Sequence, residues 1–466
     1  SRCIKGEQSI MEKLFKLKEH GTDPRTEVIA GFTTFLSMVY ILAVNPNILS
    51  AAGMDRAGIF TATAVSAAFA TLCMAFFANY PVALASGMGL NAYFAYSVCI
   101  PMAEAGIKNP WTIALAAVLV EGIAFILLSL TNFREKLVND IPESLKYGIT
   151  AGIGLFITII GLKGAGITVA SSSTLVDLGP VNKPQFILAL VGLLMIAVLH
   201  HFKVKGDILI GILGTWILGM IAQAAGWYVV NPEAGAFSLY PSFEGSNFIP
   251  KAPELFSFDF AWIGQHIISF ATIVFSFLFV DIFDTVGTLI GVASKGDLLD
   301  ENGKLPNAKG ALLADAVGTV AGACLGTSTV TSYVESSAGV AAGGRTGMTA
   351  FTTAILFIVA LFFSPIFLAI PSFATTPALV WVGLLMMSTV RKMSFDGDIA
   401  DVLGGFLAII MMPFTYSIAN GIMFGMLAWV ILKVLTGNAK KVPVVMWISA
   451  VLFACRFYTL VKGLSF

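Results

Sequence analysis

The chain has 466 residues, of which 57% belong to the hydrophobic set and only 12% carry a charge. A soluble globular domain carries roughly 25% charged residues, so this chain is short of the charge that a water-facing surface needs. The 27 basic and 27 acidic residues give a formal net charge of zero, which provides no basic field for a nucleic-acid backbone. Soluble globular, disordered and nucleic-acid-binding proteins are therefore disfavoured, and a membrane protein is indicated.

The residue types that carry metal or cofactor chemistry lack the spacing that such sites need. The five cysteines include no C-x-x-C pair, and the four histidines form no H-E-x-x-H motif. A G-x-x-x-x-G-K-[ST] phosphate loop is also absent from the sequence. We therefore expect no disulfide framework, no metal site, no cofactor and no direct use of ATP.

Apolar runs follow one another along the chain, and a run of about 20 apolar residues crosses a bilayer. Thirteen runs lie at 28–50, 58–79, 112–130, 147–168, 185–200, 207–228, 262–294, 308–325, 348–370, 373–390, 398–413, 417–436 and 443–461. Two further segments, 81–100 and 327–343, are apolar but rich in Gly, Ser, Thr and Ala. We predict an all-α polytopic membrane protein of about 14 or 15 elements, with 443–461 either a span or a surface-lying or re-entrant helix.

Basic residues in the short loops predict the orientation. If the first span runs outward, most lysines and arginines fall in loops on the side of the amino terminus. The opposite loops hold few basic residues: Arg56, Lys108, Lys163, Lys183 and Lys251. Because cytoplasmic loops carry the excess of Lys and Arg, we expect a multi-pass protein of the cytoplasmic membrane with a cytoplasmic amino terminus. This distribution of basic residues between the two sides holds only if both Gly-rich segments cross the membrane.

Both Gly-rich segments are predicted to be broken. In 79–94 a proline and small residues precede a short helical pattern, and in 327–339 a β-branched alternating stretch leads into a helix start. Non-helical backbone at membrane depth persists only where protein buries it or where it lines a cavity. Paired broken segments at corresponding places in two halves point to the binding site of a transporter.

Two acids interrupt the long apolar run at 262–294. Asp281 and Asp284 stand at i and i+3, on one helix face that Thr288 continues. A carboxylate at membrane depth costs about 2.5 to 3.5 kcal/mol even on a lenient scale. The alternative to a functional site is a salt-bridged or protonated structural pair.

The broken segments add further polar groups. Glu335 stands where the extended piece meets the second half-helix, where it either binds a ligand or only caps the helix. Asn91 lies one turn into the first half-helix, where a hydrogen bond between helices is its alternative role. Free backbone N–H groups between the opposed half-helices would complete a small polar site, at Ser86, Gly87, Met88, Tyr333, Val334 and Ser336. Glu121 and Asp315 are interpreted as packing between helices.

Five strings in the chain are similar to those of one family: TEVIAGFTTFL at 26–36, PVALASGMGLNAYF at 81–94, FDTVGTLIGV at 283–292, YVESSAG at 333–339 and GGRTG at 343–347. With these strings the sequence resembles the nucleobase–cation symporter (nucleobase–ascorbate transporter) superfamily, and specifically its adenine/guanine/hypoxanthine permease branch. The resemblance covers the chain from Thr26 to about Leu435.

The resemblance implies 14 spans in two inverted repeats of seven, with short broken helices and strands in segments 3 and 10. It implies a core domain that moves against a gate domain, often within a homodimer. On this basis the chain divides into a cytoplasmic segment at 1–25, core parts at 26–140 and 262–371, and gate parts at 141–261 and 372–466.

The resemblance also assigns roles to residues. Asp284 matches the substrate-binding acid of span 8, Glu335 the acid at the start of span 10, and Thr288 a position one turn after the span 8 acid. Backbone groups of Tyr333 and Val334 match the span 10 strand, and Asn91 and Asp281 match positions tied to function in the purine branch. The Glu-Ser-Ser-Ala-Gly string departs from the uracil and xanthine branches, which disfavours uracil, urate and ascorbate.

Both lines of reasoning lead to proton-coupled import of a purine nucleobase. Guanine and hypoxanthine are favoured, with adenine as an alternative, and sodium is the alternative to H⁺. Asp281, Asp284 and Glu335 are the candidate proton-coupling acids. Two rival classes are an anion channel or exchanger on a related fold, and a membrane enzyme that holds Mg²⁺ and a diphosphate. The enzyme is disfavoured because a second acidic motif and basic phosphate ligands are missing.

Overall fold

The computed structural model describes residues 10–131, 141–231, 236–243, 248–300 and 305–461. Helices make up most of the described chain, and eleven of them are long and apolar enough to cross a membrane. Two shorter apolar helices lie at Ile399–Thr415 and Val444–Tyr458. The all-α polytopic fold predicted from the sequence is confirmed, and the exact number of 14 spans stays a prediction.

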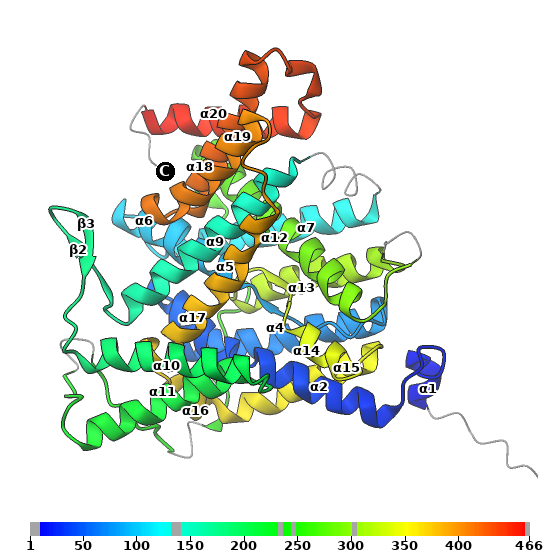
Figure 1. Ribbon diagram of the computed structural model, residues 1–466, viewed down its shortest axis with the longest axis vertical. Coiled ribbons are helices and arrows are strands. Elements are labelled where there is room, and N and C mark those ends of the chain that lie inside the picture. Colours follow the sequence, from blue (N-terminus) through cyan, green and yellow to red (C-terminus); the bar gives the residue numbers. More distant parts are fainter. Residues whose placement is uncertain (1–9, 132–140, 232–235, 244–247, 301–304, 462–466) are drawn as a thin grey trace, which may run out of the picture.

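The first half of the chain alternates long helices with one broken segment (Figure 1). Its elements are α1 (Ile10–Phe15), α2 (Pro24–Met38), α3 (Ile41–Leu49), α4 (Arg56–Phe77), β1 (Leu84–Ser86), α5 (Met88–Ala92), a π-helical turn (Tyr93–Cys99), α6 (Ile100–Glu104), α7 (Pro110–Leu130), α9 (Glu143–Gly164), β2 (Thr168–Ser171), β3 (Leu175–Leu178), α10 (Pro184–His201) and α11 (Asp207–Ala224).

The second half repeats the order of long helices around a broken segment. Its elements are α12 (Ile267–Lys295), α13 (Ala308–Leu325), β4 (Val330–Ser332), α14 (Ser336–Ala341), α15 (Gly347–Ala360), α16 (Ser364–Ala369), α17 (Ser372–Met387), α18 (Ile399–Thr415), α19 (Ile418–Leu435) and α20 (Val444–Val461). Single 3₁₀ turns link several of them, at Ser50–Ala52, Ala261–Gln265, Leu361–Phe363, Ser388–Lys392 and Ala439–Lys441.

The long helices pack in two groups. In one group α4 packs against α13 and α15, α7 packs against α12 and α13, and α2 packs against α14 and α15. In the other group α9 packs against α17 and α18, α19 packs against α18, and α10 packs against α11 and α17. The run at 443–461 forms one continuous helix, α20, that lies against α12 and α19.

Close approach of helix backbones explains the glycines at 148–154. A Cβ atom at Gly148 of α9 would lie 2.6 Å from the backbone oxygen of Gly405 in α18. A Cβ atom at Gly154 would lie 2.7 Å from the backbone oxygen of Gly383 in α17. Only glycine fits at these crossings, as is common where small residues let membrane helices meet.

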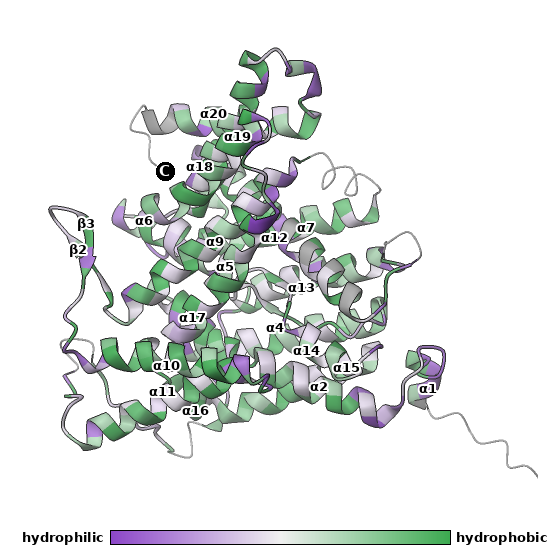
Figure 2. Ribbon diagram, viewed as in Figure 1, coloured by the Kyte–Doolittle hydropathy of each residue, from purple (hydrophilic) through white to green (hydrophobic). Residues whose placement is uncertain are grey.

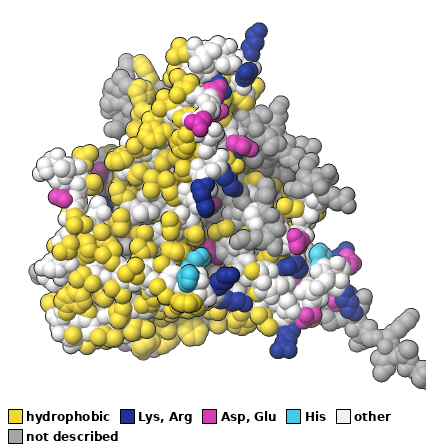
Figure 3. All heavy atoms as spheres, in the orientation of Figure 1, with side chains coloured by type: hydrophobic (Ala, Val, Ile, Leu, Met, Phe, Trp, Pro, Cys, Tyr) yellow, Lys and Arg dark blue, Asp and Glu magenta, His cyan; other side chains and the backbone are white. Residues whose placement is uncertain are grey.

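The outer surface is apolar along the helices and polar at their ends. Leu194 of α10 is 66% exposed and Ile221 of α11 is 58% exposed, as expected for side chains that face lipid. Figure 2 shows that hydrophobic residues dominate α10, α11 and α16, and Figure 3 shows the broad hydrophobic face that they form. Charged side chains gather at the end where α1 lies, opposite the β2–β3 hairpin (Figures 1 and 3).

The start of α15 is stabilised by an acid from another helix. Glu27 of α2 is fully buried and accepts hydrogen bonds from the backbone of Arg345, Thr346 and Thr349 at 2.8, 3.3 and 3.1 Å. The Thr349 hydroxyl donates a fourth bond at 2.6 Å. A buried carboxylate with four donors at a helix amino terminus is well compensated, so Glu27 acts as a structural tie.

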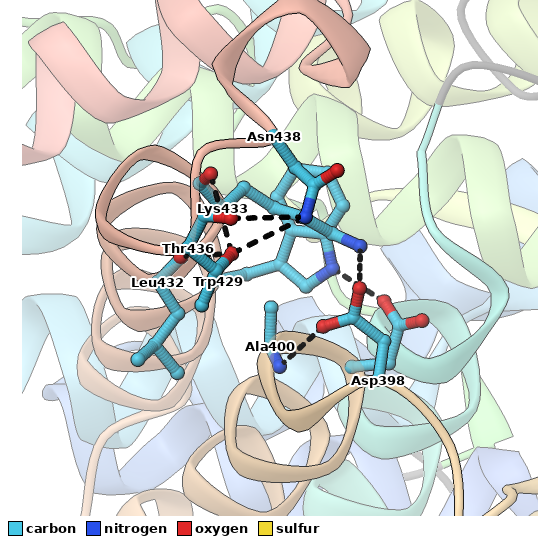
Figure 4. Close-up of polar contacts among 8 residues, drawn as sticks. Asp398, Ala400, Trp429, Leu432, Lys433, Thr436 and Asn438 are labelled. Carbon is cyan, nitrogen blue, oxygen red and sulfur yellow. Dashed lines mark hydrogen bonds and ion pairs between the residues drawn. The ribbon is translucent and has the colours of Figure 1, made fainter.

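A second polar cluster joins α18 to α19 (Figure 4). Lys433 donates to Asp398 at 2.5 Å, and Trp429 donates to Asp401 at 2.6 Å. Asp398 also caps α18 by accepting from the backbone of Ala400 at 2.9 Å. The Lys433 ammonium and this N–H group hold the pKa of Asp398 below its usual range.

We predict that Asp398→Asn lowers the thermal stability of the protein in detergent at neutral pH and loses that effect in acid. A carboxylate whose pKa is lower in the folded state stabilises the fold above its unfolded pKa of about 3.9, and its contribution disappears as pH falls through the folded pKa. Because Asp398 is 35% exposed, solvent screening limits the expected loss to roughly 0.5–1 kcal/mol. The neighbouring exposed Asp396→Asn is the control, and an equal effect of both variants would contradict the assignment.

Candidate functional site

The two broken segments meet in a buried two-stranded sheet. Strands β1 and β4 pair antiparallel, and every residue of both strands is buried. The register pairs Leu84 with Ser332, Ala85 with Thr331 and Ser86 with Val330. Backbone bonds from Gly87 to Thr329 at 3.1 Å and from Tyr333 to Ala83 at 3.0 Å extend the ladder.

Hydroxyl groups of neighbouring helices satisfy the outer edges of these short strands. The Thr71 hydroxyl of α4 contacts both the backbone N–H and the backbone oxygen of Leu84, at 3.0 and 3.1 Å. The Thr319 hydroxyl of α13 donates to the backbone oxygen of Val330 at 2.8 Å. Buried backbone groups need such partners. The threonines on α4 and α13 therefore help to stabilise the strands at this depth.

Glu335 occupies the position before α14 but does not cap that helix. Its side chain makes no capping hydrogen bond, so the interpretation of Glu335 as only a helix cap is wrong. The Tyr40 hydroxyl instead donates to Glu335 Oε1 at 2.5 Å. Tyr40 lies in the break between α2 and α3, which brings the first membrane segment into the site.

Asp284 of α12 is the second acid at this position. It is half-buried, like Glu335, and the two carboxylates act on each other electrostatically. Neither acid belongs to a salt bridge among the residues that the structure describes. Val334, between the strand and Glu335, is 50% exposed, whereas Thr288 is 8% exposed. The site therefore presents two partly accessible acids beside an exposed apolar side chain.

The side chains of the first broken segment serve mainly to hold it in place. Asn91 accepts a short hydrogen bond from the Ser328 hydroxyl and donates to the backbone oxygen of Ser86 at 3.4 Å. The Tyr333 hydroxyl donates to the same oxygen of Ser86 at 2.6 Å. Asn91 thus makes the hydrogen bond between segments that was its alternative role.

Three of the backbone N–H groups that the sequence analysis expects to be free have partners. Gly87 and Tyr333 donate across the strand crossing, and Ser336 donates to the backbone oxygen of Tyr333 at 3.1 Å. The Ser336 hydroxyl accepts from the backbone of Ala83 at 3.0 Å. The expectation of free N–H groups is therefore wrong for Gly87 and Tyr333, whose N–H groups pair the strands, and for Ser336, whose N–H group closes the turn into α14. Ser86 and Met88 are buried beside the crossing.

Asp281 does not join Asp284 and Glu335. It is fully buried and lies within hydrogen-bonding reach of Glu121 from α7, in a cluster that includes Asp315 of α13. Asp315 accepts from the backbone and hydroxyl of Ser332 at 2.9 and 3.1 Å. Glu121 and Asp315, interpreted from the sequence as helix-packing residues, therefore converge on Asp281.

Sequence reasoning missed Tyr40 as a residue of the site. The hydroxyl of a tyrosine in an apolar run gives no charge signal, and the break in the helix at positions 39 and 40 has no glycine or proline of its own. The nearest signal is Pro46, which lies inside α3 and not at the break.

Paired broken segments within a bundle of apolar helices define a multi-pass membrane protein. The chain belongs to the permease family, whose model matches residues 25–424. This match confirms the resemblance to the nucleobase–cation symporter superfamily. The family consists of permeases, in agreement with the expectation of a transporter and not an enzyme.

Curated relatives align over almost their whole length. A putative permease of Methanocaldococcus jannaschii is 47% identical over 96% of this chain and 98% of its own. A guanine/hypoxanthine permease of Bacillus subtilis is 44% identical over 96% of this chain and all of its own, and an adenine permease of Escherichia coli K12 is 41% identical over 96% of both.

Solved structures share the fold at low sequence identity. The transmembrane domain of a cyanobacterial bicarbonate transporter matches with a TM-score of 0.64 at 16% identity, over 85% of this chain and 97% of its own. A murine solute carrier 26 anion transporter in an inward-facing state matches with a TM-score of 0.62 at 12% identity, over 94% of this chain and 73% of its own.

We predict that Gly87→Ala destabilises the strand crossing and that Thr331→Ser rescues it. A Cβ atom at Gly87 would lie 2.6 Å from the Cγ2 methyl of Thr331, and overpacking of this kind costs typically 1–3 kcal/mol. Serine at 331 removes the methyl group but keeps the hydroxyl that bonds Thr285. Thermal unfolding of the single and double variants in detergent measures the effect. A double variant as unstable as Gly87→Ala would contradict the proposed contact.

Proposed function

We propose that the protein imports purine nucleobases across the cytoplasmic membrane by proton symport. The observation that carries the proposal is the pair Asp284 and Glu335, two partly accessible acids beside the paired broken segments that have no basic partner among the described residues. Relatives at 41% and 44% identity are named as adenine and guanine/hypoxanthine permeases. Ionised Glu335 would accept hydrogen bonds from the donor-rich edge of a neutral purine, with Asp284 beside it.

Guanine and hypoxanthine are favoured over adenine because both present N1–H to an acceptor, and guanine adds the 2-amino group. Adenine offers its 6-amino group but an acceptor at N1. Tyr40 already donates to Glu335 Oε1, so the remaining oxygen of Glu335, Oε2, suits the donor edge of a ligand and not an acceptor.

The two packing groups of helices support movement of one group against the other. In this proposal the core (26–140 and 262–371) carries both broken segments and moves in an elevator-like manner against the gate (141–261 and 372–466), with residues 1–25 in the cytoplasm. The basic residues on the side of the amino terminus support that orientation. One proton that crosses 100 mV supplies about 2.3 kcal/mol, equivalent to roughly a 50-fold purine gradient for one-to-one symport.

Anion exchange is the second candidate function, and only the fold of the solved neighbours favours it. Opposed half-helix amino termini attract anions. The acids at the same point, Asp284 and Glu335, would repel an anion, and this argues for a neutral base as the substrate.

Uptake of labelled hypoxanthine by cells that lack their own purine transport tests the function. We expect saturable uptake that unlabelled guanine and hypoxanthine compete strongly, adenine weakly and uracil not at all. A protonophore should abolish accumulation, because the proton gradient drives it. Uptake that survives the protonophore but needs a sodium gradient would replace H⁺ with Na⁺, and no purine uptake would refute the proposal.

We predict that Asp284→Asn and Glu335→Gln leave the protein in the membrane but abolish uptake. Each variant keeps the shape of the side chain and removes the negative charge that would accept from the purine and take part in coupling. Membrane abundance measured by immunoblotting separates loss of function from loss of protein. The exposed Glu104→Gln is the matched control, and full transport by either site variant would refute the site.

A further inference from the structure

A second acidic group lies behind the candidate substrate site. It consists of Glu121 of α7, Asp281 of α12 and Asp315 of α13, and all three side chains are fully buried. Strand β4 and the residue before it contribute hydroxyl and backbone groups to this cluster, from Thr329, Thr331 and Ser332. Asp284, one turn along α12 from Asp281, is the other charged group that acts on Asp281.

The three carboxylates differ in the hydrogen bonds that they receive. Asp315 accepts two bonds from Ser332 on one oxygen and a 2.9 Å bond from the Thr285 hydroxyl on the other. Asp315 can therefore stay ionised, because both of its oxygens have good donors.

Asp281 and Glu121 have no comparable donors. The Thr285 hydroxyl lies 3.4 Å from Asp281 Oδ1, but its one proton has nearer acceptors, which include Asp315 Oδ2 at 2.9 Å. Among the described residues, Glu121 Oε2 receives a hydrogen bond only from the Thr329 hydroxyl, at 3.4 Å. The second oxygens, Asp281 Oδ2 and Glu121 Oε1, receive no hydrogen bond from any residue that the structure describes.

Two ionised carboxylates would repel each other strongly in this arrangement. The groups that act on the pair, Asp315 and Asp284, are also acidic, so no described side chain of α7, α12, α13 or the strands neutralises it. Two adjacent buried carboxylates that lack donors must bind a cation or share a proton. A proton between Asp281 and Glu121 supplies the missing donor and removes one charge.

We propose that Glu121 and Asp281 together bind one proton, and that this proton is the one carried with the purine. The inference rests on the proposed function and adds a coupling site separate from the substrate acids, Asp284 and Glu335. Asp315 stays ionised beside the pair and fixes it to β4 through Ser332. Loss of the proton would leave two facing negative charges, which the strand contacts at Thr329 and Thr331 would have to accommodate.

Glu121→Gln in the full-length protein, reconstituted in proteoliposomes, tests the coupling. We expect the variant to bind hypoxanthine with a Kd within about threefold of the unaltered protein, because glutamine beside an ionised Asp281 carries the same net charge as the protonated pair. Accumulation driven by an inward pH gradient should fall to the level without a gradient. Glu104→Gln is again the control. Accumulation by Glu121→Gln with the pH-gradient dependence of the unaltered protein would overturn the inference.

Infrared spectroscopy of carboxyl groups gives a readout that needs no substrate. We expect the unaltered protein to show the band of a protonated carboxyl group at neutral pH. Glu121→Gln should remove this band. If Glu121→Gln does not fold, Asp281→Asn should remove it instead. Absence of the band from the unaltered protein would overturn the inference whatever the variants do. Failure of the unaltered protein to bind any purine, with the band present, would refute the proposed substrate and leave the proton site standing.

Discussion

The pairing of β1 with β4 is the constraint on which the rest of the molecule depends. Extended backbone at membrane depth has polar groups that lipid cannot satisfy, so each broken segment is tolerable only because the other lies against it. The crossing also fixes what surrounds it. Threonines on α4 and α13 supply the remaining hydrogen bonds, and small residues such as Gly87 allow the contact with Thr331.

The number of hydrogen bonds that each buried acid accepts distinguishes the structural acids from the candidate functional ones. Glu27 receives four bonds and Asp315 three, and both hold elements together. Glu335 receives one from Tyr40, which leaves capacity for a ligand. From the described residues, Glu121 and Asp281 receive only long hydrogen bonds, from the hydroxyls of Thr329 and Thr285. Burial alone does not distinguish these groups, because Glu27 is as buried as Asp281. The number and distance of their donors do.

The sequence predicts the membrane fold, both broken segments and the acids, because each departs from an apolar background. It cannot predict which acids meet. Asp281 and Asp284 stand three residues apart, which suggests one shared site, yet Asp281 meets Glu121, 160 positions away in the chain. Tyr40 escapes notice for the same reason, since its partner Glu335 is 295 positions distant. Contacts between helices depend on packing angles and rotations that periodicity does not encode.

Strand β4 joins the two acidic groups physically. Thr329 lies next to Glu121, Thr331 bonds Thr285 at 2.8 Å, and Ser332 bonds Asp315. The same strand continues into Tyr333 and Glu335. A change of charge on the Glu121–Asp281 pair therefore acts on the backbone that presents the substrate acid.

Linkage then requires reciprocity: if the proton raises the affinity for purine by some factor, the purine raises the affinity for the proton by the same factor. Hydrogen bonds from a purine would partly neutralise an ionised Glu335, which would then repel Asp284 less and favour the ionised form of Asp284. An ionised Asp284 makes the environment of Asp281 more negative and favours the proton on the Glu121–Asp281 pair, so repulsion among the acids links the purine and the proton in the sense that symport requires.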